Sequence, residues 1–182
     1  MNRTTAIFTL TALMTSSAVA STLFPQRIEV GDQSLDKLGE YRYIYRLFFD
    51  LYEAALFTEP GADAADVLRA DVAFHLQFRY LREIDKSIIL ESADLMLERN
   101  LNPEERASIK ERVEIINEGY TSVKKGYESS LSYKPDIGTT LSINGEKVVT
   151  IKGKDFAELY FRIWLGKKAI SKNLKLNLLG KN

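Results

Sequence analysis

The chain lacks cysteine and has a single histidine, and these two shortages exclude several kinds of site. Without cysteine there can be no disulfide bond and no thiolate nucleophile. One histidine, His75, cannot supply the usual zinc ligand sets. It also lies inside a predicted strand, where a histidine is more often a partly buried structural residue than a catalytic base. Gly-x-Gly-x-x-Gly and P-loop motifs are missing as well. We therefore expect no metal and no cofactor.

An excess of charge is also missing, because 25 basic side chains balance 25 acidic ones. Nucleic-acid-binding domains carry a concentrated basic surface, so we expect no nucleic-acid partner. Simple electrostatic attachment to anionic lipid is disfavoured for the same reason. No apolar run approaches the roughly 20 residues that span a bilayer, so we expect no membrane span.

Residues 1–20 have the three-part pattern of a secretory signal peptide. Arg3 supplies the positive start, Ala6 to Met14 is apolar apart from threonines, and Ala18-Val19-Ala20 fits a small-residue cleavage site. We predict cleavage after Ala20 and a periplasmic or otherwise secreted protein. Residues 21–182 are of a length that normally forms one domain with one core.

The predicted strands and helices follow one another in blocks. Strands are expected at 26–30, 42–57 (one strand or a bent pair) and 72–78, followed by helices at 83–99 and from Asn102, where Pro103 and Glu105 complete a capping pattern. Further strands are expected at 130–133, 139–143 and 147–151, the last two joined by an Asn144-Gly145 turn. This order predicts an α+β fold, a largely antiparallel sheet with helices packed on one face.

The final stretch predicts a helical lid that packs on this sheet. Apolar residues recur at helical spacing before Gly166 ends the helix, and they are Phe156, Leu159, Tyr160, Ile163 and Trp164. Ser171 is a suitable N-cap for a second short helix, whose Leu174, Leu178 and Leu179 share one side.

The sequence motifs of this stretch resemble those of the chalcone isomerase-like proteins of bacteria. The resemblance lies in a strand hairpin followed by Gly-x-Asp-Phe (153–156), Ile-Trp-Leu-Gly (163–166) and Leu-Leu-Gly (178–180), and it extends over residues 30 to 180. It implies an open-faced sandwich with a ligand cleft between the sheet and the helices. Many such proteins are thought not to be enzymes, so the fold transfers better than the activity.

Arg42 and Tyr52 are the positions that the resemblance assigns to the cleft. On the residues alone, a guanidinium near the end of an apolar strand is either solvated or directed into a pocket, where it can bind a carboxylate. The blocks Leu38 to Arg42 and Leu51 to Leu56 match those that carry an arginine and a hydroxyl side chain in chalcone isomerases. Plant enzymes have threonine at the position of Tyr52, whereas relatives that bind fatty acids have tyrosine and hold the carboxylate with an Arg/Tyr pair. The expected cleft walls are Tyr45, Phe49, Phe156, Tyr160 and Trp164.

Three functions remain open at this point. The favoured one is a non-catalytic, exported protein that binds a small hydrophobic or amphipathic carboxylate such as a fatty acid. The second is an intramolecular lyase of the chalcone isomerase type, which acts on an α,β-unsaturated ketone and needs little beyond orientation and stabilisation of the enolate. The third is a structural or interaction protein of the cell envelope without a small ligand. The sequence does not give the ligand, the protein partners or the oligomeric state.

Overall fold

The computed structural model of this chain describes residues 23–45 and 49–181, so the predicted leader lies outside the described part. The described residues form a seven-stranded sheet whose strands are all antiparallel and lie in the order of the chain. The strands are β1 (Arg27–Val30), β2 (Gln33–Tyr45), β3 (Phe49–Thr58), β4 (Phe74–Tyr80), β5 (Glu128–Lys134), β6 (Gly138–Ile143) and β7 (Glu146–Ile151).

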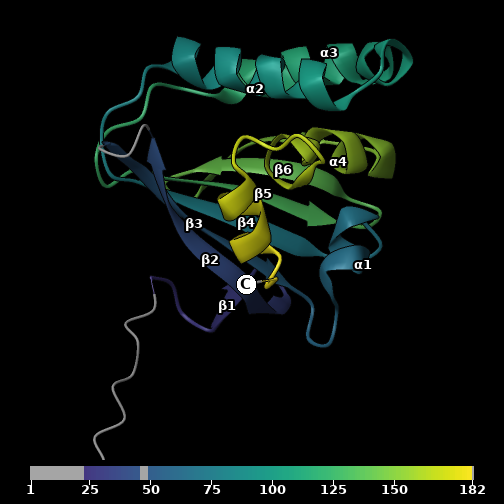
Figure 1. Ribbon diagram of the computed structural model, residues 1–182. Helices are drawn as coiled ribbons and strands as arrows, with labels where there is room; N and C mark the ends of the chain where they lie inside the picture. The colour runs from purple at the N-terminus through teal and green to yellow at the C-terminus, as the bar shows by residue number, and fades with distance from the viewer. Residues whose placement is uncertain (1–22, 46–48, 182) are drawn as a thin grey trace, which may run out of the picture.

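The helices pack on one face of this sheet, called here the inner face, which confirms the predicted α+β arrangement (Figure 1). They are α1 (Ala64–Leu68), α2 (Lys86–Asn100), α3 (Pro103–Gly119), α4 (Lys154–Tyr160), α5 (Arg162–Leu165) and α6 (Lys172–Leu178). Helices α2 and α3 lie side by side, α4 covers β6, and α6 crosses β2 and β3 (Figure 1). The predicted strand 42–57 is a bent pair, β2 and β3.

The local sequence signals explain several element ends. Asn102 accepts a hydrogen bond from the backbone N–H of Glu105 at 2.8 Å, and the Glu105 carboxylate accepts one from the Asn102 N–H at 2.9 Å, so the predicted capping box of α3 is confirmed. Asn144 and Gly145 have φ values of 49° and 83°, as a type I′ turn between β6 and β7 requires. The closing helix is divided into α4 and α5, with only Phe161 between them.

The main core lies between the inner face and the helices, and a smaller one lies on the opposite, outer face. The outer core consists of Phe24, Leu35, Ala55 and Phe57. Helix α6 approaches β2 so closely that a Cβ on Gly39 would collide with the backbone carbonyl oxygen of Asn177. Glycine at this position therefore sets the distance between the lid and the sheet.

Two features of the described residues bear on the function classes. Within the described residues, no helix has both the length and the apolar character needed to cross a membrane. The same part of the chain contains no group of three or more histidine, aspartate and glutamate side chains that could hold a metal ion.

Candidate functional site

An apolar hollow lies between the inner face of the sheet and the first half of α2, and we call it the inner cleft. Its volume is about 100 Å³. No carboxylate, amine or guanidinium is found among the described residues that line it. Its walls are Tyr43, Leu51, Tyr52, Phe78, Tyr80, Ile84, Ile88, Ile89, Leu90, Ser92, Ala93, Tyr120, Ser129, Tyr160, Ile163, Trp164 and Ile170.

Strand register produces the row of tyrosines at the base of the inner cleft. Tyr43 on β2, Tyr52 on β3 and Tyr80 on β4 are direct cross-strand partners, and alternation along each strand directs them to one face. Ser129 lies on the same face of β5, opposite Phe78. Tyr52 packs edge-on against Phe78, with ring centroids 5.3 Å apart. A hydroxyl-rich floor therefore lies below the mainly apolar residues that α2 contributes to the cleft.

The hydroxyl groups of this floor differ in their hydrogen bonds. The Tyr80 hydroxyl lies 2.9 Å from the Ser129 Oγ, and the Tyr160 hydroxyl donates to the Tyr120 hydroxyl at 3.4 Å. The Tyr52 hydroxyl is buried and has no hydrogen-bond partner. A buried polar group without a partner is rare, and here it leaves the Tyr52 O–H free to donate a hydrogen bond.

Burial keeps these phenols neutral. It raises the pKa of Tyr52 well above its ordinary value, and the neighbouring Tyr43 and Tyr80 add to the effect. It also raises the pKa of Tyr80, raises that of Tyr120 strongly, and raises that of Tyr160 to about 12. At neutral pH the cleft therefore offers O–H donors in an uncharged environment.

Arg42 is not part of the inner cleft, so the predicted Arg42/Tyr52 pair is not brought together. Arg42 lies opposite Glu53, whereas Tyr52 lies opposite Tyr43, and adjacent residues of a strand point to opposite faces. The Arg42 guanidinium donates to the Glu53 carboxylate at 2.6 and 3.1 Å on the outer face, and its side chain is 48% exposed. It cannot reach a head group that Tyr52 contacts.

The other residues predicted as cleft walls differ in whether they line the inner cleft. Tyr160 and Trp164 line the inner cleft. Phe156 is fully buried behind it, stacked on Tyr160 with ring centroids 5.0 Å apart, and is a core residue in this structure. For Tyr45 and Phe49 the structure describes the strand backbone but not the side chains, so this part of the prediction lies outside the described structure.

Five hydroxyl residues of the cleft were not predicted as site residues: Tyr43, Tyr80, Ser92, Tyr120 and Ser129. Tyr80 and Ser129 could have been found from strand alternation, because Ser129, Leu131 and Tyr133 share the inner face of β5. Tyr120 follows the last residue of α3, so its position depends on how that helix packs.

The predicted structural role of His75 agrees with its surroundings. It is buried on the outer face, and its Nδ1 lies 2.7 Å from the Ser132 Oγ on the neighbouring strand. Burial lowers its pKa to about 4, so the imidazole is neutral at neutral pH.

Comparison with known proteins identifies the family. A family model described as chalcone isomerase-like matches residues 16–180, nearly the whole chain. The chain belongs to the chalcone isomerase-like family. Among curated protein sequences, none matches it. Among solved structures, it is similar to a fatty-acid-binding protein of Arabidopsis thaliana, with 13% sequence identity, a TM-score of 0.61 and coverage of 86% of this chain and 91% of the other.

At this level of identity, the similarity to the Arabidopsis protein establishes the fold alone. Within that fold, this chalcone isomerase-like protein has its cleft where the sequence resemblance implied, between sheet and helices. The polar groups in the cleft are tyrosine and serine hydroxyls, and the described lining has no cation. These groups can donate hydrogen bonds to a small molecule but cannot neutralise a charge.

Proposed function

We propose that this chalcone isomerase-like protein binds a small amphipathic molecule in the inner cleft and does not transform it chemically. The apolar part would lie against α2 and Trp164, and the polar end would accept a hydrogen bond from Tyr52. The observation that carries the proposal is the buried Tyr52 hydroxyl, which has no partner at the base of an uncharged, largely apolar hollow. The fatty-acid-binding protein of similar fold supports the same class of ligand by analogy.

The neutral walls favour a neutral polar end. Moving a carboxylate into an apolar site without a cation is strongly unfavourable, and such a group takes up a proton instead. A fatty-acid-like ligand would therefore occupy the inner cleft as the protonated acid. Its affinity should rise as the pH falls toward the pKa of the free acid, and a long-chain alcohol should bind at neutral pH without this dependence.

The first half of α2 provides the route of entry. The cleft volume of about 100 Å³ is below the range of roughly 300–1,000 Å³ of ordinary ligand sites, so a ligand must displace part of the wall. The buried residues of α2 are Met96 and Leu97 near its end, whereas Ile88 near its start is 52% exposed. A segment with few buried contacts opens at low free-energy cost, so α2 should yield at its first turns.

Trp164 gives a direct test, because it is the only tryptophan of the chain and lines the cleft. Decanol and decanoic acid, titrated at about pH 5 and pH 7, should change its fluorescence. Tyr52→Phe should weaken binding about fivefold, since it removes one hydrogen bond and leaves the ring in place.

Two matched variants serve as controls for this titration. Tyr133→Phe removes a hydroxyl from the same sheet face outside the cleft, and Arg42→Gln removes the cation from the outer face. Neither should change the affinity. Unchanged binding by Tyr52→Phe, or loss of binding by Arg42→Gln, would contradict the proposal.

The non-catalytic part of the proposal rests on the same phenols. Their raised pKa values make them poor at exchanging protons at neutral pH. A chalcone added to the protein should cyclise no faster than in buffer, as followed by its absorbance. Acceleration that Tyr52→Phe abolishes would establish the isomerase alternative instead.

We also propose that the protein is exported and that its leader is cleaved after Ala20. The sequence pattern of residues 1–20 supports this, and these residues lie outside the described part of the structure. Expression of the full chain in a Gram-negative host, followed by fractionation and mass spectrometry, should give a periplasmic protein that begins at Ser21. An intact Met1 terminus on the cellular protein would contradict export.

A further inference from the structure

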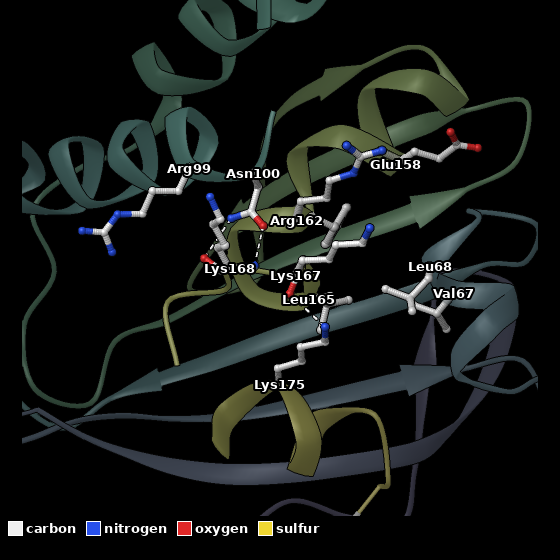
Figure 2. Close-up of a pocket in the computed structure, with 13 residues that line it drawn as sticks. Val67, Leu68, Arg99, Asn100, Glu158, Arg162, Leu165, Lys167, Lys168 and Lys175 are labelled. Atoms are coloured by element: carbon white, nitrogen blue, oxygen red, sulfur yellow. Dashed lines mark hydrogen bonds between the residues drawn. The ribbon is translucent and has the colours of Figure 1, made fainter. Parts of the chain in front are cut away.

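A second and larger hollow, called here the basic pocket, lies between α1, the end of α2, α5 and α6 (Figure 2). Its volume is about 610 Å³, within the range of ordinary small-molecule sites. Its floor is apolar, formed by Val67, Ala157, Phe161 and Leu165, which are all buried. Leu68 of α1 adds an exposed apolar side chain at the mouth.

The rim of the basic pocket is strongly cationic. Lys167, Lys168 and Lys175 line it together with Arg99 and Arg162, against one acidic residue, Glu158. Arg162 is paired with Glu105 at 2.9 Å, so the lysines carry the free charge of the rim. In Figure 2, Lys167 and Lys175 face Val67 and Leu68 across the hollow, whereas Arg99 points away from it.

The lysine charges of this rim are not neutralised by the protein. Within residues 23–45 and 49–181, no carboxylate forms an ion pair with Lys167, Lys168 or Lys175. Glu158 lies 3.9 Å from Lys154, so it is directed to a different cation. Burial, with a smaller effect of the nearby Lys181, lowers the pKa of Lys175.

The backbone that carries these lysines is held in place. The Asn100 side chain accepts a hydrogen bond from the Lys168 N–H at 2.8 Å and donates to the Lys168 carbonyl at 2.9 Å. Lys175 donates to the carbonyl of Gly166 at 2.9 Å, which leaves two of its three N–H donors for another partner. The rim is therefore preorganised, and binding would order mainly the ends of the lysine side chains.

The basic pocket is separate from the inner cleft. The two hollows share no lining residue, and α5 contributes Arg162 and Leu165 to one and Ile163 and Trp164 to the other. Their chemistry also differs, because the inner cleft is uncharged and the basic pocket combines an apolar floor with unpaired cations.

We propose that the basic pocket binds an anionic amphiphile, a molecule with a carboxylate or phosphate head group and an apolar chain. The head group would lie between Lys167, Lys168 and Lys175, and the first part of the chain would cover Phe161 and Leu165. A cationic rim alone would suit any anion, and it is the apolar floor that favours an amphiphile over inorganic phosphate.

The amide resonances of Gly166, Lys168 and Asn100 provide the test. Dodecyl phosphate, titrated into the full-length protein, should shift the backbone amide signals of Gly166 and Lys168 and the side-chain amide of Asn100 in two-dimensional NMR spectra. The apparent affinity should fall as salt is added, since the lysines are at the surface. Decanoate should act on the same signals, and neutral decanol, which is expected in the inner cleft, should leave those of Lys168 and Asn100 unchanged.

A lysine pair elsewhere in the chain provides a matched control. Lys167→Gln/Lys168→Gln should weaken dodecyl phosphate binding at these signals at least tenfold. Lys124→Gln/Lys125→Gln makes the same change of charge at an exposed pair outside the pocket and should have no effect. The dispersion of the NMR spectrum shows whether each variant is folded, and the salt titration of the wild type does not depend on any variant.

Three results would overturn the proposal. Inorganic phosphate that binds as tightly as dodecyl phosphate would make this a simple anion site. If decanol produced the same shifts, the lysines would not be what recognises the ligand. Equal dodecyl phosphate affinities of the two lysine-pair variants would lead to the same conclusion. Because Trp164 fluorescence reports on the inner cleft separately, failure here is distinguishable from failure of the proposed function.

Discussion

Arg42 and Glu53 lie directly opposite each other on β2 and β3, and their ion pair of 2.6 Å fixes the arginine on the outer face of the sheet. Glu53 also lies 3.4 Å from Arg79 on β4, and Arg79 lies 3.0 Å from Glu128 on β5. These side chains form a row of alternating charge across four strands. The arginine that the sequence assigned to a ligand therefore belongs to a network that joins strands.

The central position of Glu53 in this row predicts a stability effect. Glu53→Gln should lower the free energy of unfolding by about 2 kcal/mol, because the buried carboxylate accepts charge-assisted hydrogen bonds from two arginines. Urea unfolding measures this. Asp36→Asn breaks the exposed Arg27–Asp36 pair and should give no measurable change. Equal effects of the two substitutions would contradict the assigned role.

His75 should make stability depend on pH. Its folded-state pKa of about 4 is below the ordinary value of 6.5, so between these values the unfolded chain binds a proton that the folded chain does not. The contribution of neutral His75 to the free energy of unfolding is complete above about pH 6.5. It is lost as the pH falls toward 4, and the total loss is about 3 kcal/mol. Urea unfolding at several pH values should show a shallower decline for His75→Gln than for the wild type. Parallel curves would disprove the assignment.

Gly39 should tolerate no side chain. Gly39→Ala places a Cβ against the backbone of α6, which cannot move without leaving the sheet, so we expect a loss of at least about 3 kcal/mol. Thermal or urea unfolding checks the value. Gly119→Ala is the comparison, because its Cβ would meet only methyl ends of Val148, Val149 and Leu141, and it should cost much less. A mild Gly39→Ala would mean that α6 is loosely docked.

The cleft tyrosines should resist ionisation. The raised pKa values of Tyr52, Tyr120 and Tyr160 predict that these phenols stay protonated in the folded protein at about pH 11, where the phenols of the unfolded chain are ionised. Ultraviolet absorbance of tyrosinate follows this directly. The phenols of the unfolded chain ionise near pH 10. The contribution of the protonated phenols to the free energy of unfolding is therefore present below that pH and is lost as the pH rises. Full ionisation before unfolding would show that water enters the cleft.

Patterns with a fixed local geometry could be predicted from the sequence. The capping residues Asn102 and Glu105, the Asn144-Gly145 turn and the apolar stripe of Phe156, Tyr160 and Trp164 each specify their own backbone over a few residues. Together with the block order of strands and helices, they gave the fold class and the family.

The face of the sheet on which Arg42 lies could not be predicted in this way. Register shifts between Lys37 and Gly39 and between Tyr43 and Ile44 interrupt the simple alternation of β2, and a shift of one residue exchanges the two faces. The side chain is then held on the outer face by Glu53, eleven residues away in the sequence. Tyr120 and the basic pocket could not be predicted for a similar reason. The position of Tyr120 and the walls of the pocket depend on helices that meet only in the tertiary structure.

The strands of this sheet are paired in the order in which they are synthesised, and this has a consequence for how the fold can change. Most of the hairpins close a short loop, but the connection from β3 to β4 carries α1, and the longest one, from β4 to β5, carries α2 and α3. Doubling the length of a flexible loop costs only about 0.6 kcal/mol, so this connection can lengthen or shorten with little effect on the β framework. The part of the helical cover that α2 and α3 provide is thus the part of the molecule that evolution can remodel most freely, while the meander beneath it persists.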